Sequence, residues 1–306
     1  MSFNNGRLRY FVAVAEEGQI TRAAAKLHIA QPALSQAIAQ LEVELGITLF
    51  ERTARGVTLT RSGAAFLPKA QAAVASEDDL AALGEGLKRS TAGIIEMGFV
   101  GPPPTMNAPE LFDAFALAHP QAEVSFRDLP FPQGPTLSWL RDVDVAFCVP
   151  PEVEAGVSVQ IVRTEPRAIV AHRSHPLAGR AEITVGEALS ETFISYDPAV
   201  QARWTAFHSL DDHRGGPPLS VTIDHATSSL QMLGIMTTGR GVTTVPLSDA
   251  RLAVHVMPDL VAIPVTDAAP AALSLIWAQS VDHPTVQALI GVARDLAADA
   301  GRRPPT

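Results

Sequence analysis

The stretch "TRAAAKLHIAQPALSQAIAQLEVEL", residues 21–45, holds two helical runs that are separated by a very short turn. Alanines favour a helix over 21–27, the run stops at 28–30, and a second run begins beside Pro32, which the first turn of a helix tolerates. The second run carries a narrow apolar stripe at helical spacing, opposite a polar face: Leu34, Ile38, Leu41 and Leu45. We therefore expect a helix-turn-helix whose second helix buries this stripe and projects its first turn outward.

The flanking segments extend this unit. An earlier helix, ended by Gly18, is predicted by apolar residues on one face: Leu8, Phe11, Val12 and Ala15. Thr21 is predicted as the N-cap of the next helix, and a later hairpin has Arg55-Gly56 at its predicted tip. Thr60 is then predicted to cap a long helix from 61 to about 88. Its near-heptad apolar spacing indicates that a second chain covers it.

Composition and charge narrow the class of protein. Of the 306 residues 47% are hydrophobic and 18% charged, which excludes a disordered chain, and the single cysteine, Cys148, excludes an internal disulfide. No signal peptide or apolar stretch of bilayer length is visible, so we expect a cytoplasmic protein without a membrane partner. The net charge is -9, yet residues 1–61 hold seven basic and five acidic residues. This distribution fits a protein that contacts an anionic partner through its N-terminal residues 1–61 only.

After residue 92 the pattern changes to alternating strands and helices. Strands near 94–100, 124–126 and 143–149, with helices between them, predict a parallel sheet with helices on its faces. A second α/β series, a last strand and a last helix are expected over 167–245, 272–278 and 284–298. Two α/β lobes of about 100 residues each follow from this pattern.

The first turn of the helix that begins at Gln31 suits DNA. Its backbone N–H groups and the helix dipole favour a phosphate, and Gln31 and Gln36 face away from the apolar stripe, where glutamine pairs with adenine edges in the major groove. Nearby side chains fit phosphate contacts: Thr21, Arg22, Lys26 and Ser35. Arg52 and Arg55 on the hairpin are placed to reach the flanking groove. The alternative is an ordinary three-helix packing unit that binds nothing.

The order of residues in this region favours the DNA-binding interpretation. Residues 11–63, "FVAVAEEGQITRAAAKLHIAQPALSQAIAQLEVELGITLFERTARGVTLTRSG", closely resemble the N-terminal domain of LysR-type transcriptional regulators. The likeness continues more loosely to the C-terminus through "GFVG" (98–101), "DVAF" (144–147), "SHPLA" (174–178) and "SSLQMLGIMTTGRGVTTVP" (228–246). The subgroup that the chain most resembles regulates the catabolism of aromatic compounds.

The resemblance implies a multidomain α and α/β protein that is a transcriptional regulator and not an enzyme. It implies a winged helix-turn-helix over 1–60, a dimerising linker helix over 61–91 and a two-lobed, periplasmic-binding-protein-like effector domain over 92–306. Lobe I is expected at 92–163 plus 266–306 and lobe II at 164–265. Members form homodimers and usually homotetramers on double-stranded promoter DNA, and we also expect contact with RNA polymerase. A small molecule between the lobes, here an organic acid or aromatic metabolite, is expected to control them, and no cofactor is implied.

Family positions also suggest individual roles. Gln31, Pro32 and Gln36 match base-facing positions, and Ser35 and Arg52 match positions that face the DNA backbone. Many members carry arginine at the position of Gln36, so the glutamine here favours adenine over guanine at that step.

Three segments are expected to face the cleft between the lobes: "GPPPTM" (101–106), "FPQG" (131–134) and "SYDPAVQARW" (195–204). The subgroup usually places Ser or Thr after "GFVG", where this chain has Pro102, and this departure puts carboxylate binding in question. The candidate effector contacts are Pro102, Thr105, Gln133, Phe147, Tyr196, Arg203 and His225. Simpler roles are a helix cap for Thr105, a surface ion pair for Arg203 and a core position for Phe147.

Two other functions stay open. Residues 1–91 could be the oligomerisation arm of an enzyme or of a transport-type binding protein, although GxSxG and GxGxxG patterns are absent from the sequence. Cys148 could be a redox switch, but it has no second cysteine to resolve it, so a buried thiol is the simpler interpretation. The histidine pairs 172/175 and 208/213 do not complete a metal-binding pattern, and we expect no metal.

Overall fold

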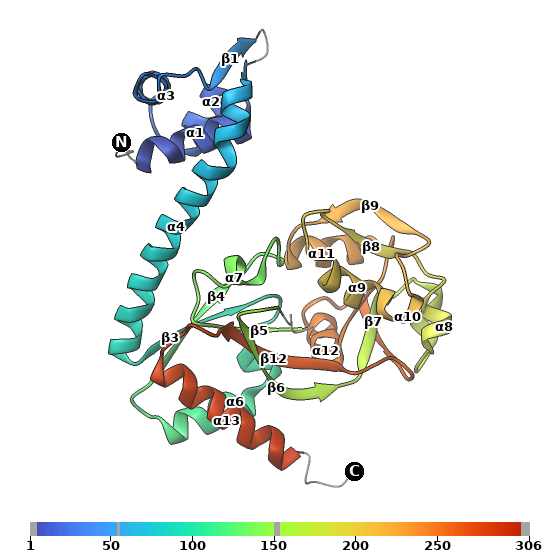
Figure 1. The fold of residues 1–306 in the computed structure, drawn as a ribbon. Coiled ribbons are helices and arrows are strands. Elements are labelled where there is room, and N and C mark those ends of the chain that lie inside the picture. Colours follow the sequence, from blue (N-terminus) through green and yellow to red (C-terminus); the bar gives the residue numbers. More distant parts are fainter. Residues whose placement is uncertain (1–4, 54–55, 150–153, 301–306) are drawn as a thin grey trace. The chain divides into compact units, whose positions relative to one another are not determined.

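The computed structural model describes residues 5–53, 56–149 and 154–300 (Figure 1). The chain divides into two compact units, Met1–Glu85 and Gly86–Thr306, and each unit has its own hydrophobic core. Within the described ranges, each helix is too short or too polar to cross a membrane.

The first unit consists of three helices, a hairpin and the beginning of a long helix. In chain order the elements are α1 (Asn5–Glu17), α2 (Ile20–Lys26), α3 (Gln31–Leu45), β1 (Phe50–Thr53), β2 (Gly56–Leu59) and α4 (Arg61–Ala92). Leu34, Ile38 and Leu41 of α3 are buried in the core that α1 and α2 also form, as the stripe predicts, whereas Leu45 is half-buried. The burial of this stripe fixes which side of α3 faces solvent.

The buried face of α1 differs from the predicted one. Its buried residues are Leu8, Phe11, Ala13 and Val14. The predicted Val12 and Ala15 are only half-buried. Because α1 contacts both α2 and α3, its buried surface is wider than a single helical stripe.

The turns around α2 depend on residues with positive φ. Gly18 (φ 63°) ends α1, and α2 then begins at Ile20 with Gln19 as its N-cap. The prediction that Thr21 caps this helix is therefore wrong, because Gly18 turns the chain early enough for Thr21 to lie inside the first turn. At the other end His28 adopts φ 53°, a left-handed conformation that is uncommon outside glycine, and this lets α3 begin after a very short turn.

The hairpin is fixed to the rest of the first unit at its base. The backbone N–H of Val57 donates to the carbonyl of Gly18 over 2.9 Å. A Cβ on Gly56, which has φ 142°, would collide with that same carbonyl oxygen, so glycine is required there. Beyond the hairpin, Thr60 Oγ1 accepts from the N–H of Gly63 over 2.9 Å and caps α4 as predicted. The helix itself continues to Ala92, past its predicted end.

The second unit holds two lobes. The first lobe is formed by β3 (Ile94–Phe99), α5 (Pro104–Asn107), α6 (Pro109–Ala118), β4 (Glu123–Asp128), α7 (Thr136–Trp139), β5 (Val145–Cys148), β6 (Val157–Glu165), β12 (Ala271–Ala278) and α13 (Pro284–Ala300). Its sheet has the strand order β4-β3-β5-β12-β6. Strand β3 is parallel to β4 and β5, but β12 is antiparallel to β5 and β6. The predicted parallel sheet is thus correct for three strands, because the last strand returns from the second lobe in the opposite direction.

The second lobe is formed by β7 (Arg167–His172), η1 (Pro176–Gly179), α8 (Val185–Ala188), β8 (Phe193–Tyr196), α9 (Ala202–Ser209), α10 (Asp211–Arg214), β9 (Val221–Ala226), α11 (Ser229–Thr237), β10 (Thr243–Pro246), α12 (Leu247–Val256) and β11 (Leu260–Val265). Its strands form an antiparallel sheet, β10-β7-β11, and a parallel pair, β8-β9. The sequence did not predict β6, α12 or β11. Polar residues alternate with apolar ones in β6, and although Pro246 and Pro258 border α12, no element was predicted between residues 246 and 271.

Candidate functional site

One candidate site is the polar face of α3, formed by Gln31, Pro32, Ser35 and Gln36. Gln31, Pro32 and Gln36 are exposed, Ser35 is half-buried, and the Gln31 amide Nε2 donates to Ser35 Oγ over 3.1 Å. Ala30 precedes the helix and offers no side-chain cap, so the first N–H groups of α3 are not occupied by a capping side chain. This face therefore presents amide side chains beside a helix N-terminus that suits an anion.

Three predicted phosphate contacts lie on α2. Thr21, Arg22 and Lys26 are all exposed. The Arg22 guanidinium lies 3.1 Å from Glu17, and the Lys26 amine lies 3.1 Å from Glu16. Hydrogen bonding to Glu16, and then to Glu17, raises the pKa of Lys26. Exposed ion pairs of this kind are weak and screened by salt, so a phosphate can replace the carboxylates.

The hairpin provides one more described cation. Arg52 lies on β1, opposite Val57 of β2, and its side chain is exposed. Arg55, the other predicted contact, lies outside the described residues. The structure thus brings eight of the nine predicted DNA contacts onto the surface of one compact unit.

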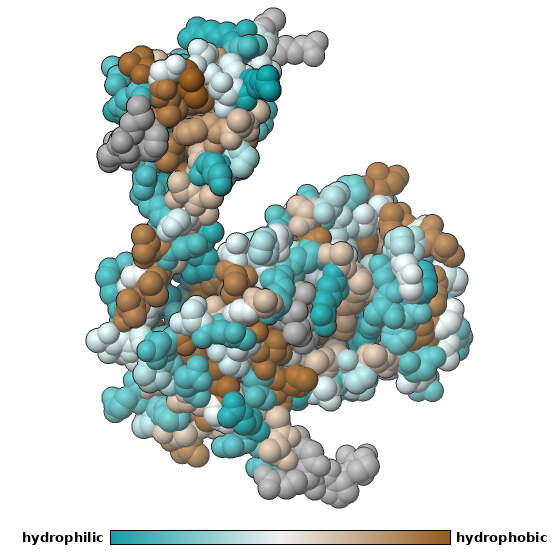
Figure 2. All heavy atoms as spheres, in the orientation of Figure 1, coloured by the Kyte–Doolittle hydropathy of each residue, from teal (hydrophilic) through white to brown (hydrophobic). Residues whose placement is uncertain are grey.

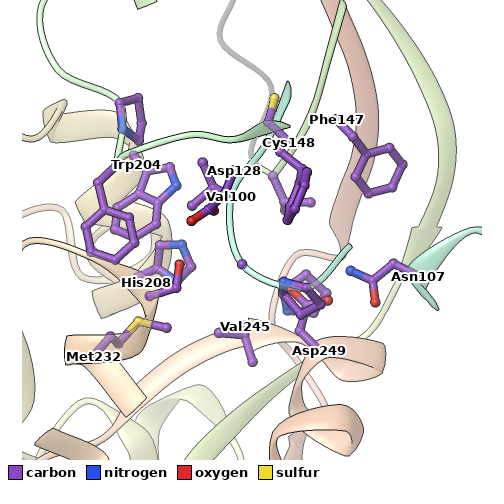
Figure 3. Close-up of a pocket in the computed structure, with 18 of the residues that line it drawn as sticks. Val100, Asn107, Asp128, Phe147, Cys148, Trp204, His208, Met232, Val245 and Asp249 are labelled. Atoms are coloured by element: carbon purple, nitrogen blue, oxygen red, sulfur yellow. The ribbon is translucent and has the colours of Figure 1, made fainter. Parts of the chain in front are cut away.

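The second candidate site is a cavity of about 530 Å³ in the second unit (Figure 3). The first lobe contributes the ends of β3 and β5 and the loops that follow β3 and β4. The second lobe contributes α9, α11, α12 and the end of β10. Carboxyl ends of strands commonly border ligand sites in such folds. The aromatic and polar residues that line it include Phe131, Trp204, His208, Asp128, Asn107 and Asp249.

Two of the seven predicted effector contacts, Pro102 and Phe147, line this cavity. The other five do not line it, and each has another environment. Thr105 and Arg203 are exposed on α5 and α9, and Gln133 is exposed and forms a bridge with Val200. Tyr196 is buried and its hydroxyl lies 2.8 Å from Thr243 Oγ1, while the His225 ring nitrogen Nδ1 lies 2.8 Å from Ser195 Oγ.

An aromatic cluster forms one wall of the cavity. The ring centroids of Phe131 and Trp204 are 4.3 Å apart, and those of Tyr196 and Trp204 are 5.1 Å apart. His208 lies one helical turn after Trp204 on α9, with 3.9 Å between the ring centroids. The candidate contacts included Tyr196 but not Trp204, although the segment 195–204 that was expected to face the cleft ends with Trp204. Only the structure shows which of these rings borders the cavity.

His208 is neutral and acts as an acceptor. Its Nδ1 lies 2.7 Å from the carbonyl oxygen of Thr244, so Nδ1 carries the proton and Nε2 is left as an acceptor. The pKa of His208 is lowered to about 3, mainly by burial and in smaller part by the nearby Arg167, while the hydrogen bond to Thr244 acts against this fall. The sequence had raised His208 only as a metal ligand. Among the described residues no group of three His, Cys, Asp or Glu side chains could hold a metal ion.

Asp249 is the second polar group that the sequence missed. It lies in the first turn of α12, and its carboxylate oxygen Oδ1 is buried without a hydrogen-bond partner among the described residues. Burial first, and then repulsion from Glu165, raise the pKa of Asp249 to about 7, while Asn107 and Arg163 act against this rise. The only sequence signal is its position a few residues after the predicted strand at 242–245.

Two family profiles match the chain. The profile described as "Bacterial regulatory helix-turn-helix protein, lysR family" matches residues 6–64, and the profile described as "LysR substrate binding domain" matches residues 88–298. The first match contains the polar face of α3. The second contains every residue named above as lining the cavity.

Individual relatives match over most of their length. HTH-type transcriptional regulator TfdS of Cupriavidus pinatubonensis (strain JMP 134 / LMG 1197) is 31% identical over 294 residues, 94% of this chain and 97% of the relative. The uncharacterized HTH-type transcriptional regulator YnfL of Escherichia coli (strain K12) is 31% identical over 264 residues, 84% of this chain and 86% of that protein. The crystal structure of full-length CbnR complexed with its target DNA shares the fold, with a TM-score of 0.52 and 22% identity over 96% of this chain and 99% of CbnR.

Proposed function

This chain belongs to the LysR family and is a DNA-binding transcriptional regulator with a C-terminal effector-binding domain, and from that premise we propose how its two sites work. The polar face of α3 reads promoter DNA, and a small molecule in the cavity of the second unit controls that binding. The family is one of transcriptional regulators, which removes the enzyme interpretation of residues 1–91.

The proposal for DNA rests on one observation, the separation of the two sides of α3. Leu34, Ile38 and Leu41 are buried, while Gln31 and Gln36 are exposed beside an uncapped helix N-terminus. Amide side chains in that position can read adenine edges in the major groove. The proposed phosphate contacts are Thr21, Arg22, Lys26, Ser35, Arg52 and Arg55, with Pro32 beside the bases.

A mobility-shift titration on the DNA upstream of the target gene tests these roles. We expect Gln36→Ala to reduce the preference for the operator over unrelated DNA, because it removes a base contact worth about 1–3 kcal/mol. Gln121→Ala is the matched control, since Gln121 is an exposed glutamine of the second unit. An unchanged preference in Gln36→Ala would exclude this side chain from base readout.

The same titration over a range of salt concentrations tests Arg52. Arg52→Ala should weaken binding to all sequences alike and lower the slope of log K against log salt by about one for each bound subunit. Arg251→Ala removes the same charge from an exposed position on α12 and serves as control. Equal slopes in all three proteins would contradict a phosphate contact by Arg52.

We also propose that the chain acts as a homodimer or homotetramer. On α4, Leu80, Leu83 and Leu87 recur at helical spacing and are 69%, 58% and 55% exposed. In the second unit Leu219 and Ile223, in and beside the edge strand β9, are 88% and 92% exposed, and apolar surface gathers there in Figure 2. We propose that other copies of the same chain bury these apolar surfaces, because a symmetric operator is bound by a symmetric pair of DNA-binding domains. Sedimentation of the protein and of Leu83→Glu tests this.

The domain limits and the cellular context are proposed on the same basis. We place the DNA-binding domain at 1–60, the linker helix at 61–91 and the effector domain at 92–306, with lobes at 92–163 plus 266–306 and at 164–265. Regulation of a promoter implies action in the cytoplasm and contact with RNA polymerase. For Cys148 we expect no redox role, so Cys148→Ser should retain the effector response.

A further inference from the structure

The polar groups of the cavity carry information about the class of effector, provided that the cavity is the effector site proposed above. Among its described lining residues, no side chain is a lysine or an arginine, and the ionisable acids are Asp128 and Asp249. His208 is neutral and presents the acceptor Nε2. The charged side chains of these walls are therefore carboxylates, and none of the described lining residues offers a carboxylate ligand a positively charged partner.

Helix N-termini are the other common source of anion binding, and side chains already occupy three of those at the cavity. At the start of α5, prolines at 102, 103 and 104 leave these three positions without an N–H, although no side chain caps this helix. The N–H of Thr136 at the start of α7 donates to Glu154 over 3.1 Å. Ser228 caps α11, and Glu165 accepts from Ser248 N over 2.9 Å at the start of α12. Among the described helices that begin at the cavity, α9, which starts at Ala202, also has no side-chain cap.

Asp249 lacks the partner that a buried carboxylate needs. Asn107 hydrogen-bonds to the carboxyl group, yet Oδ1 is buried and unpaired among the described residues. An unpaired buried acceptor costs free energy, and a ligand that donates to it recovers that cost. Figure 3 shows Asp249 and Asn107 on one side of the cavity and His208 and Trp204 on the other.

The aromatic wall suits the same kind of ligand. Phe131 and Trp204 are packed with their ring centroids 4.3 Å apart, and both border the cavity. Aromatic faces bind apolar groups, and they also attract cations. A volume of about 530 Å³ is in the range of sites for small organic molecules.

We infer that the effector of this chain is an apolar organic amine, with its ammonium group donating to Asp249 and its apolar body against Phe131 and Trp204. This inference names the ligand class of the site proposed above. It departs from the organic acid that the sequence led us to expect.

Three probes that share an apolar phenylbutyl group and differ in their polar group test the proposed class of effector. Isothermal titration of the full-length protein at pH 8 compares 4-phenylbutylamine, 4-phenylbutan-1-ol and 4-phenylbutanoate. A charge-assisted hydrogen bond contributes about 1.5–3 kcal/mol, so the amine should bind at least about tenfold more tightly than the alcohol or the acid. Tighter binding of the acid would overturn the inference and indicate the start of α9 as an anion site. Equal binding of amine and alcohol, or no binding of the amine, would also overturn it.

The pH dependence gives a test that requires no variant. The charged groups acting on Asp249 are Glu165 and Arg163 of β6, and Asn107 of α5 hydrogen-bonds to it. The strands that contact α12 most closely add Arg167 and His172, at the ends of β7, and Asp128 and His208 line the same cavity. With a pKa of about 7, Asp249 is mostly protonated at pH 6 and mostly ionised at pH 8, so amine affinity should rise about tenfold between them. An affinity that does not change with pH would contradict the assignment of Asp249.

A variant pair separates Asp249 from general charge effects. Asp249→Asn should weaken the amine about tenfold or more and leave the alcohol within about twofold. Asp259→Asn is the control, because Asp259 is 55% exposed, pairs with Arg173 and does not line the cavity. Operator binding is measured on the same preparations. Operator binding without amine preference would reject this inference alone, whereas amine preference without operator binding would reject the proposed DNA function.

Discussion

Mostly exposed side chains form the polar face of α3, whereas the cavity of the second unit is lined mainly by half-buried and buried ones. On α2, beside that face, Arg22 and Lys26 lie in exposed ion pairs that exchange easily. In the cavity, His208 and Asp249 have strongly shifted pKa values because burial disfavours their charged forms. It follows that the residues proposed to read DNA can be changed at little cost in stability. The residues proposed to hold the effector, in contrast, also take part in the folding of their unit.

The strongest test of this contrast removes the support beneath the exposed face. Leu34→Ala should lower the free energy of unfolding of the first unit by about 2–5 kcal/mol, because Leu34 is 0% exposed. DNA binding should be lost while titration of the cavity with the amine probe is unchanged. Val43→Ala on the same helix is the control, since Val43 is 74% exposed. Calorimetry in which both units lose stability together would contradict the independence of the two cores.

A second test removes a buried charge within the second unit. Asp144 accepts from Arg89 Nε over 2.9 Å and Nη2 over 2.8 Å, and from the N–H of Glu96 over 2.8 Å. Asp144→Asn should destabilise this unit by about 2–3 kcal/mol, because Arg89 loses its charged acceptor. The exposed Asp142 provides the control variant Asp142→Asn. Equal thermal midpoints for the two variants would show that the Arg89 pair does not contribute to stability.

A third test concerns acid. His208 has a folded pKa of about 3, below the usual 6.5 of an unfolded chain, so its stabilising effect is complete above pH 6.5 and is lost as pH falls. Asp249 has a folded pKa of about 7, above the usual 3.9, so its contribution falls as pH rises from about 4 to 7. The two trends oppose each other between about pH 4 and 6.5.

In the Asp249→Asn variant, the pH dependence of stability should therefore reflect His208 without the opposing effect of Asp249. We expect the variant to gain about 1–3 kcal/mol at pH 8, because Asp249 is partly buried and its ionisation is costly. Its stability should then fall steadily as pH drops below 6.5. Urea titrations at several pH values measure both effects, and parallel curves for variant and wild type would refute the opposing shifts.

The smallest effect on stability belongs to the polar face of α3. Gln36→Arg should change the unfolding free energy by less than about 0.5 kcal/mol, because Gln36 is exposed. It should nevertheless move base preference at one position of each half-site from adenine towards guanine. Selection of bound sequences from a random DNA pool measures this change. A variant with the wild-type preference would place Gln36 outside the groove.

The sequence predicted the first unit better than the cavity, and the reason is physical. The stripe of Leu34, Ile38 and Leu41 and the cap at Thr60 are local signals, because the interacting positions lie within a few turns of one another. The cavity brings together Asn107, His208 and Asp249 from distant segments. Local periodicity cannot report that juxtaposition, and α12, which carries Asp249, was not predicted at all.

The same limit applies to the strands. The parallel strands β3, β4 and β5 follow from alternation along the chain, whereas β12 returns antiparallel from the far end of the sequence. Side-chain roles failed in a similar way. Tyr196 was expected at the ligand but lies behind Trp204 and Phe131, because one ring in a packed aromatic cluster screens another.

The left-handed turn at His28 has a consequence for the evolvability of this regulator. A residue with a side chain pays about 1–2 kcal/mol to adopt such a conformation, and glycine does not. Replacement of His28 by a residue that tolerates positive φ should therefore raise the thermal stability, at a position that is exposed to solvent. In a library selected for growth at higher temperature, we expect glycine and asparagine to accumulate at position 28 and valine and isoleucine to disappear.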